Sequence, residues 1–225
     1  MKVKESIAAE FDQFSGNYTE DMTKCVPHYP KLLSCFADCL PDDFSPDAIL
    51  DLGCGNGNVT ALLLKKFPHA HYTLLDASPE MLALCKQRFS GNNVTCIERY
   101  FRDYDFPRCR FDLITASFSL HHLDSGEKQW IFPILFDALK PGGLFTCSDL
   151  MISKHHDQYE TLREEWRLLS IPIIPMEKSG NGSRSTIASM TTRKILKHKN
   201  AGCFVPDFVR SASAGMTGTG CILSR

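Results

Sequence analysis

Residues 51–58 combine an acidic side chain with a glycine-rich turn, an arrangement that could hold a small charged ligand. They read Asp-Leu-Gly-Cys-Gly-Asn-Gly-Asn and lie between a short apolar run and an amphipathic run. Glycines in such a turn let the backbone approach a ligand closely, because a Cβ atom would collide with it. Asp51 could face a cationic or amine-bearing group beside the turn. The pattern therefore favours a cofactor site over a turn with only a structural role.

The spacing of the glycines indicates which class of cofactor the turn could bind. Dinucleotide-binding turns have the pattern G-x-G-x-x-G/A, in which the third small residue packs the helix on the strand. Here the pattern is G-x-G-x-G, and Asn58 stands at the position of that third small residue. A phosphate-binding P-loop needs a lysine after its last glycine, and none follows this turn. The turn therefore favours a nucleoside cofactor without a pyrophosphate.

A second acidic residue, Asp76, supports a cofactor site. It lies 25 positions after Asp51, at the end of the next apolar run. A carboxylate at the end of that strand can accept hydrogen bonds from both hydroxyls of a ribose. We therefore expect Asp76 to bind the ribose of the cofactor.

Strands and helices that alternate between about Ala48 and Met151 must position these residues. Short apolar runs separated by amphipathic segments are typical of a parallel sheet with crossover helices. We predict an α/β fold with a doubly wound, seven-stranded, mostly parallel sheet, which binds ligands outside the carboxyl ends of its strands. The predicted strands of this region are 48–52, 71–75, 94–98, 111–116 and 144–150, and its predicted helices are 59–67, 78–89 and 127–139, with Ser78 as an N-cap.

The segments on either side of this region are less regular. Residues 1–45 are predicted to form an N-terminal helical cap, with two helices separated by a polar stretch, and residues 46–225 an α/β domain, as a single domain overall. Substrate determinants are expected within residues 157–189. The further predicted elements are helices at 6–14, 30–40, 158–169 and 191–200, a long loop at 171–189, and weak strands at 204–210 and 216–223.

Composition excludes several classes of protein. The chain has 225 residues, of which 43% are hydrophobic and 23% charged, as in an ordinary globular protein with a substantial core. Its formal net charge of -1 gives no overall signal for binding DNA or an anionic membrane, although a local RNA-binding face stays open. The ten cysteines form no C-x-x-C pair and are interpreted as reduced thiols, and no signal peptide or long apolar run is found, so we expect a cytoplasmic protein.

Four segments between about Ala48 and Met151 form an ordered set of motifs. They are ILDLGCGNGNVT, LLDASPEML, FDLITASFSLHHL and LKPGGLF. In this order and spacing they resemble the class I S-adenosylmethionine-dependent methyltransferases. The resemblance implies a Rossmann-like methyltransferase fold, S-adenosylmethionine as cofactor, and methyl transfer as the reaction.

The same resemblance implies roles for individual residues. Asp76 would hold the ribose with Ala77 beside it, and Met81 would pack on the adenine. Ser117, just after the fourth strand, would meet the amino-acid end of the cofactor. The residues of the turn that would line the methionine half are Gly53, Cys54, Gly55 and Gly57.

The adenine site departs from the family's pattern. An aspartate usually ends the third strand and accepts from the adenine amino group, but the aligned residue here is Tyr100, followed by Phe101. Asp103 could replace that aspartate only if the loop is remodelled. Adenine could instead be held by stacking and by the Phe101 amide. The missing contact is worth roughly 1.5 to 3 kcal/mol, as a charge-assisted hydrogen bond.

A narrower resemblance lies in the N-terminal segment DMTKCVPHYPKLLS. It is similar to the D-M-x-x-x-V-P-x-Y segment of carboxy-S-adenosylmethionine synthases, which make a modified cofactor for wobble-uridine modification in transfer RNA. The resemblance implies that Tyr29 contacts the cofactor and that Arg184 is the candidate for binding its added carboxylate. However, the spacing from Arg184 to Ala201-Gly202 is shorter than in the synthases. Ser117 also replaces the asparagine that the synthases have at the fourth strand. Synthase-like chemistry is therefore kept as the alternative.

Two residues near the ends of the fourth and fifth strands are candidates for proton transfer. His121 could act as a general base, or its segment could position the loop and satisfy buried polar groups. Asp149 could be a base or a substrate anchor, or a carboxylate that orders the loop. The neighbouring His122 is interpreted as structural.

Other reactive side chains favour simpler interpretations. Cys54 could be a nucleophile at a helix N-terminus, but a small residue that fits the turn is the preferred interpretation. Tyr18 and Tyr29 could close over the cofactor or pack the N-terminal helices. The histidines lack the spacing and the nearby acids that a metal site needs, so no metal is expected.

The sequence therefore predicts an S-adenosylmethionine-dependent methyltransferase that acts on a small-molecule or RNA acceptor. A carboxy-S-adenosylmethionine synthase-like enzyme and a non-catalytic cofactor-binding module are the alternatives. We expect a small-molecule or transfer RNA substrate, no binding to DNA or a membrane, and leave a homodimer open.

Overall fold

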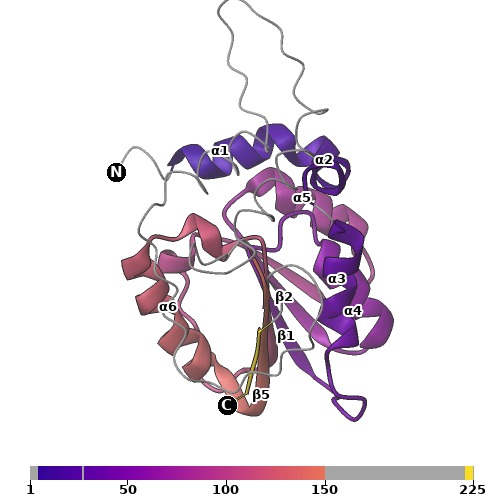
Figure 1. Cartoon of the computed structure of the whole chain (residues 1–225), viewed down its shortest axis with the longest axis vertical. Coiled ribbons are helices and arrows are strands. Elements are labelled where there is room, and N and C mark those ends of the chain that lie inside the picture. The colour runs from indigo at the N-terminus through magenta and orange to yellow at the C-terminus, as the bar shows by residue number, and fades with distance from the viewer. Residues whose placement is uncertain (1–4, 27, 150–220, 225) are drawn as a thin grey trace, which may run out of the picture.

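A twisted sheet with helices on both faces forms the centre of the molecule (Figure 1). The computed structural model describes residues 5–26, 28–149 and 221–224. Within these residues the sheet has six strands, in the order β3-β2-β1-β4-β5-β6. The strands are β1 (Ala48–Leu52), β2 (His71–Asp76), β3 (Val94–Glu98), β4 (Phe111–Ser117), β5 (Leu139–Ser148) and β6 (Cys221–Ser224).

The first five strands are parallel, and β6 pairs antiparallel with β5. The chain order reverses direction at β1, whose neighbours are β2 and β4, and this switch point is where a doubly wound sheet binds its ligand. The predicted doubly wound α/β fold is thus confirmed. A seventh strand is not, because the predicted strand at 204–210 lies outside the described residues, as do the predicted helices at 158–169 and 191–200. The fifth strand begins at Leu139, five residues before the predicted start.

The helices largely follow the sequence prediction, with one addition. Ser78 caps α5, since its hydroxyl accepts from the Met81 N–H at 3.1 Å, as expected. The helix α2 was missed, because it is short and its segment is mostly polar, with Tyr18, Met22 and Cys25 as its apolar side chains. The helices are α1 (Glu5–Phe14), α2 (Tyr18–Cys25), α3 (Tyr29–Asp38), α4 (Asn58–Lys66), α5 (Pro79–Arg88) and α6 (Ser125–Ala138), and the short 3-10 turns are η1 (Ser15–Asn17), η2 (Phe101–Asp103) and η3 (Leu120–His122).

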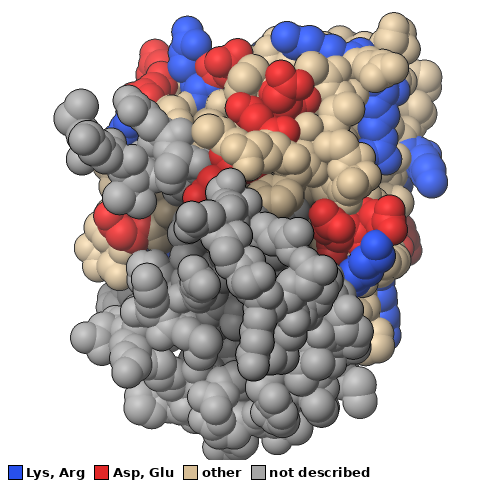
Figure 2. Space-filling view, turned by 90° about the horizontal axis from the view of Figure 1, so that it is seen from above, with Lys and Arg blue, Asp and Glu red and all other residues tan. Residues whose placement is uncertain are grey.

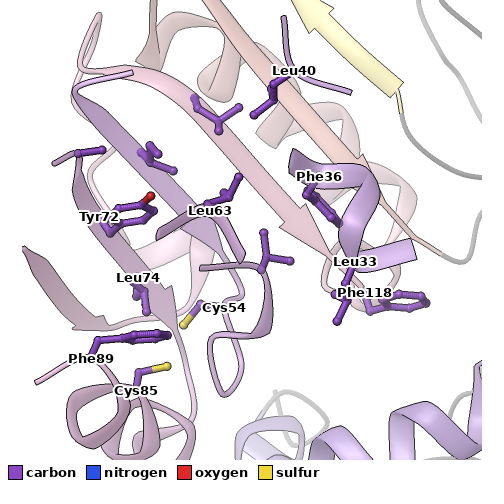
Figure 3. Close-up of a cluster of buried hydrophobic side chains, with 14 of the residues drawn as sticks. Leu33, Phe36, Leu40, Cys54, Leu63, Tyr72, Leu74, Cys85, Phe89 and Phe118 are labelled. Atoms are coloured by element: carbon purple, nitrogen blue, oxygen red, sulfur yellow. The ribbon is translucent and has the colours of Figure 1, made fainter. Parts of the chain in front are cut away.

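Each face of the sheet buries its own hydrophobic cluster. Ile49 and Leu50 are adjacent in β1 and both fully buried, yet Ile49 belongs to the cluster under α3 and α4, and Leu50 to the cluster under α6. The first cluster brings Phe36 and Leu63 together with Tyr72 (Figure 3). A strand that is buried on both faces leaves only its ends for a ligand. The carboxyl ends of β1, β2, β4 and β5 are therefore where a site can form.

The N-terminal helices α1 and α2 lie across that end of the sheet, above α5 (Figure 1). The α1 carboxylate of Asp12 accepts from the Ser78 hydroxyl at 2.6 Å, which ties α1 to the start of α5. Farther along, α3 packs on α4. Within the described ranges, no helix is long and apolar enough to cross a membrane.

Candidate functional site

The glycine-rich turn folds tightly over the end of β2. The N–H groups of Gly53 and Cys54 both donate to the Leu75 carbonyl, at 2.7 and 3.2 Å. Gly53 has a φ of +69°, and a Cβ atom there would lie 2.4 Å from the Cβ of Ser119. Backbone conformation and the lack of space therefore both require glycine at this position.

Asp76 faces this turn. Its Oδ2 accepts from the Gly55 N–H at 2.8 Å, and its Oδ1 accepts from the Ser78 N–H at 2.9 Å. Burial raises the pKa of Asp76, and the backbone N–H groups of Gly55, Ala77 and Ser78 oppose that rise. An ionised carboxylate has about four acceptor positions, so it keeps capacity for hydroxyl donors from a ligand. Asp76 and the half-buried Ala77 thus lie where the sequence places the ribose.

Asp51 lies inside the sheet and does not face the turn's open side. Its side chain is enclosed, 2% exposed, and it accepts from the hydroxyls of Thr60 at 2.6 Å and Thr115 at 3.2 Å. The expectation that Asp51 meets an amine-bearing group of the cofactor stays a prediction. Because Thr60 belongs to α4 and Thr115 to β4, the Asp51 carboxylate holds β1, β4 and α4 together below the turn.

The buried Asp51 should make folding depend on pH. Burial raises the pKa of Asp51 from 3.8 to about 6 in the folded state. The folded chain then binds more protons than the unfolded chain between these values, so the stability contribution of Asp51 falls as pH rises from about 4 to about 6. In Asp51→Asn this fall should disappear. We expect urea unfolding to show the variant gaining about 2 to 3 kcal/mol relative to the wild type between about pH 4 and pH 7. An equal difference at both pH values would contradict the buried ionisation.

Aromatic residues lie at the end of β3, where the sequence predicts the adenine site. The Phe101 ring lies against the turn, 3.2 Å from where a Cβ of Gly53 would be. Tyr100 is half-buried, and the guanidinium of Arg102 lies 5.5 Å from its ring centre. Asp103 is exposed and pairs with Arg102 at 3.7 Å. The structure thus places Phe101 closest to the turn, whereas Asp103 belongs to the surface.

Met81 and Ser117 border the same region on α5 and β4. Met81 is only 1% exposed, so an adenine could reach no more than a small part of its side chain in this structure. Ser117 is half-buried at the last position of β4, opposite Ser148 of β5. Their predicted contacts with the cofactor stay predictions.

Cys54 behaves as a small buried residue of the turn. Burial raises the pKa of the Cys54 thiol well above its usual value, so little thiolate forms near neutral pH. Both the Cys54 and Cys85 thiols lie near the Gly55 carbonyl, at 3.5 and 3.2 Å. This environment favours the structural interpretation of Cys54 over a nucleophile. Gly57 is packed in the same way, since a Cβ there would lie 2.4 Å from the Phe89 ring.

His121 and Asp149 form a pair across the ends of β4 and β5. The His121 Nδ1 lies 2.6 Å from Asp149 Oδ1, and the His121 backbone N–H donates to Asp149 Oδ2 at 2.9 Å. The Asp149 side chain is fully buried, and that of His121 is 14% exposed. A carboxylate at Nδ1 favours the tautomer with the proton on Nδ1, which leaves the Nε2 lone pair available. Two candidates that the sequence considered separately are thus one unit.

His122 has a different environment. Its ring lies 4.0 Å from the His121 ring, and the Phe11 ring of α1 meets it edge-on at 5.3 Å. His122 therefore packs between the His121–Asp149 pair and α1 of the cap, which favours the structural role predicted for it. Among the described residues, no group of three or more histidines, cysteines or acids could hold a metal ion.

The structure separates the two N-terminal tyrosines. Tyr29 is 3% exposed, its hydroxyl accepts from Asn58 Nδ2 at 3.2 Å, and its ring packs on Phe118. Tyr18 instead lies over the turn, with Cε1 3.7 Å from where a Cβ of Gly55 would be. Both tyrosines thus contact the glycine-rich segment, Tyr29 through Asn58 and Tyr18 over Gly55, and the predicted contact of Tyr29 with the cofactor stays a prediction. No spacing rule marks Tyr18, because only the folded cap brings it there.

Comparisons with known proteins agree with this arrangement. Residues 49–143 match the sequence model of the methyltransferase domain family. A trans-aconitate 2-methyltransferase of Acidovorax is 39% identical over 106 residues, which cover 44% of this chain and 37% of that protein. A carboxy-S-adenosyl-L-methionine synthase of Salmonella arizonae is 25% identical over 166 residues, which cover 65% of this chain and 66% of that protein.

A solved structure supports the fold. The complex of the Haloferax volcanii Trm112 methyltransferase activator with a methyltransferase matches with a TM-score of 0.54 and 20% identity, covering 72% of this chain and 76% of the other. With the glycine-rich turn, Asp76 and the sheet order, these matches identify residues 49–143 as a methyltransferase domain similar to those of the class I S-adenosylmethionine-dependent methyltransferases. S-adenosylmethionine is the cofactor of that class. The matched part spans less than half the length of the first curated relatives.

Proposed function

We propose that the protein transfers the methyl group of S-adenosylmethionine to a small-molecule or RNA acceptor. The observation that carries the proposal is the contact between the Gly55 N–H and Asp76, because it joins the glycine-rich turn to the acid at the end of β2. A nucleoside bound there would meet backbone on one side and a carboxylate on the other.

The residues around the turn fit this cofactor. Gly53 and Gly55 add no side chain to the turn, Asp76 would accept from the ribose, and Phe101 presents an apolar ring beside Gly53. When bound, S-adenosylmethionine supplies a methyl group on a sulfonium that is already a good leaving group. The protein's main tasks are therefore to align the acceptor and to exclude water. The N-terminal helices that cross the site supply such a cover.

His121 would remove the acceptor's proton if the acceptor is a hydroxyl or an amine. Its Nε2 can take up a proton, while Asp149 keeps the ring in place through Nδ1 and stabilises the charge that forms. Because Asp149 also accepts from the His121 backbone N–H, the ring and the loop are oriented together. This gives His121 the catalytic role and Asp149 the positioning role.

Titration calorimetry with S-adenosylmethionine tests the proposal directly. We expect saturable one-site binding by the wild-type chain, because backbone hydrogen bonds hold the turn and Asp76 in place. Mass spectrometry of small molecules released from freshly purified protein identifies the form of the cofactor that it carries. Transfer of radiolabelled methyl groups to fractionated metabolites and transfer RNA then screens for the acceptor. Absence of binding at millimolar ligand would refute the proposal.

A carboxy-S-adenosylmethionine synthase-like enzyme is the second candidate. The match to the Salmonella arizonae synthase favours it, since it covers more of this chain than the trans-aconitate enzyme does. Conversion of S-adenosylmethionine to its carboxylated form in the presence of prephenate would support this candidate. The test variant is Arg184→Ala, at a position outside the described residues. Binding without either reaction would instead indicate a non-catalytic module.

We propose that the acceptor is a small molecule or a transfer RNA, rather than DNA or a membrane. We also propose that the protein acts in the cytoplasm, as a monomer or a homodimer. The net charge of -1 supports the proposed class of acceptor. On the described part of the face seen from above, basic and acidic side chains are interspersed without a continuous basic patch (Figure 2). The cysteines described as free thiols support a reducing compartment.

A further inference from the structure

Asn58 is a buried polar residue at which three helices meet the glycine-rich turn. It is 9% exposed and is the first residue of α4. Its Nδ2 donates to the hydroxyls of Thr19 at 2.9 Å and Tyr29 at 3.2 Å. Its Oδ1 accepts from Arg88 Nη1 at 3.0 Å. Asn58 therefore links α2, α3 and α5 to the turn.

Thr19 connects α2 to the turn at a second point. Its hydroxyl also accepts from Asn56 Nδ2 at 2.7 Å, so one threonine of α2 binds two residues of the glycine-rich segment. Thr19 itself is exposed. Met22 of α2 is buried in the hydrophobic cluster, and the hydrogen bonds of Thr19 fix the end of α2 that carries Tyr18.

The attachment positions Tyr18, which precedes Thr19 in the chain. Tyr18 lies over Gly55, the residue whose N–H binds Asp76. On the other side of Tyr18, Asp12 fastens α1 to Ser78. The part of the cap that covers the turn is therefore held from both sides, and Tyr18 lies between the two attachments.

We propose that Asn58 is a positioning residue which, through Thr19, holds Tyr18 over the glycine-rich turn and so slows the release of the cofactor. The inference rests on the proposed function, because it concerns the same site. In dinucleotide-binding proteins a small residue at this position packs the helix on the strand. The motif assigns no role to an asparagine there. Here its amide is used to fasten the cap.

The test compares Thr19→Val, Asn58→Ala and the double variant, with S-adenosylhomocysteine as the probe. Calorimetry gives the affinity, and stopped-flow displacement gives the dissociation rate. Thr23→Val is the matched control, because the Thr23 hydroxyl donates to the Thr19 carbonyl within α2 rather than to the turn. Hydrogen exchange of the ligand-free proteins reports separately on α2.

Each single variant should raise the dissociation rate and the dissociation constant about threefold to tenfold, which corresponds to one net hydrogen bond. The dissociation constant of the double variant should exceed that of the weaker-binding single variant by no more than about twofold, because both changes break the same link. Amides of α2 should exchange faster in both variants and not in Thr23→Val. If Asn58→Ala does not fold, Thr19→Val alone decides, since Thr19 is exposed.

An unchanged dissociation rate of S-adenosylhomocysteine in Thr19→Val would overturn the inference. A double variant whose dissociation constant is raised by the product of the two single effects would also overturn it. A lower unfolding free energy with unchanged cofactor release would do the same, because it would show a structural role alone. If the wild-type chain does not bind the probe, the proposed function fails. In that case the exchange data still decide whether Asn58 and Thr19 hold α2.

Discussion

The variant His121→Asn should lower kcat for methyl transfer by about 10²- to 10⁴-fold, the usual contribution of a positioned general base. Asparagine can donate to Asp149 as His121 Nδ1 does, so the buried carboxylate keeps a partner and the fold is protected. It cannot take up a proton, however. The rate is measured with the acceptor identified by radiolabelled methyl transfer.

Two further measurements separate proton transfer from a loss of structure. Affinity for S-adenosylhomocysteine should stay within about threefold of the wild type, because His121 has no role in holding the cofactor. His122→Ala is the matched control, since its ring packs on Phe11 and should change kcat little. A variant at His121 that retains the full rate would show that the sulfonium alone drives the reaction.

Asp76→Asn should weaken binding of S-adenosylmethionine about 100-fold or more. The carboxylate would lose its charge-assisted bonds to the ribose, each worth roughly 1.5 to 3 kcal/mol. An asparagine amide would also point a donor at a backbone donor, because Asp76 now accepts from the N–H groups of Gly55 and Ser78. We therefore expect the free energy of unfolding to fall as well, by about 1 to 3 kcal/mol.

Asp103→Asn is the control for this change. Asp103 is exposed and pairs with Arg102 at 3.7 Å, and the same substitution there should leave affinity and stability unchanged. Calorimetric titration of both variants gives the comparison. If Asp103→Asn weakened binding as much as Asp76→Asn, the loop after β3 would have to supply the lost adenine contact. If neither did, the ribose site would lie elsewhere.

Much of the fold could be predicted from residue patterns. The strands at 48–52 and 94–98 were predicted with the correct bounds, and Ser78 was correctly identified as the cap of α5. Local rules of this kind work because apolar periodicity and capping depend on neighbouring residues. The short helix α2 was not predicted, because its segment is mostly polar and its tertiary contacts, such as the burial of Met22 and the hydrogen bond of Thr19 with Asn58, come from residues distant in the chain.

The candidate site was predicted in part. The sequence correctly indicated that the glycine-rich turn and Asp76 would meet, because parallel strands bring their carboxyl ends to one edge. It did not indicate that Asp51 is buried and accepts hydrogen bonds from Thr60 and Thr115. It also favoured Tyr29 over Tyr18, because a motif near Tyr29 was recognisable and the position of α2 was not.

The order and spacing of the motifs alone indicated the class of this protein and its cofactor. They also indicated the edge of the sheet at which the cofactor site is expected. Only the tertiary structure decided that His121 is bound to Asp149, 28 residues away, and that Tyr18 rather than Tyr29 covers the turn. The physical reason is that spacing along the chain encodes strands, turns and caps. Which side chains touch across the site depends instead on how the sheet, its crossovers and the N-terminal helices pack.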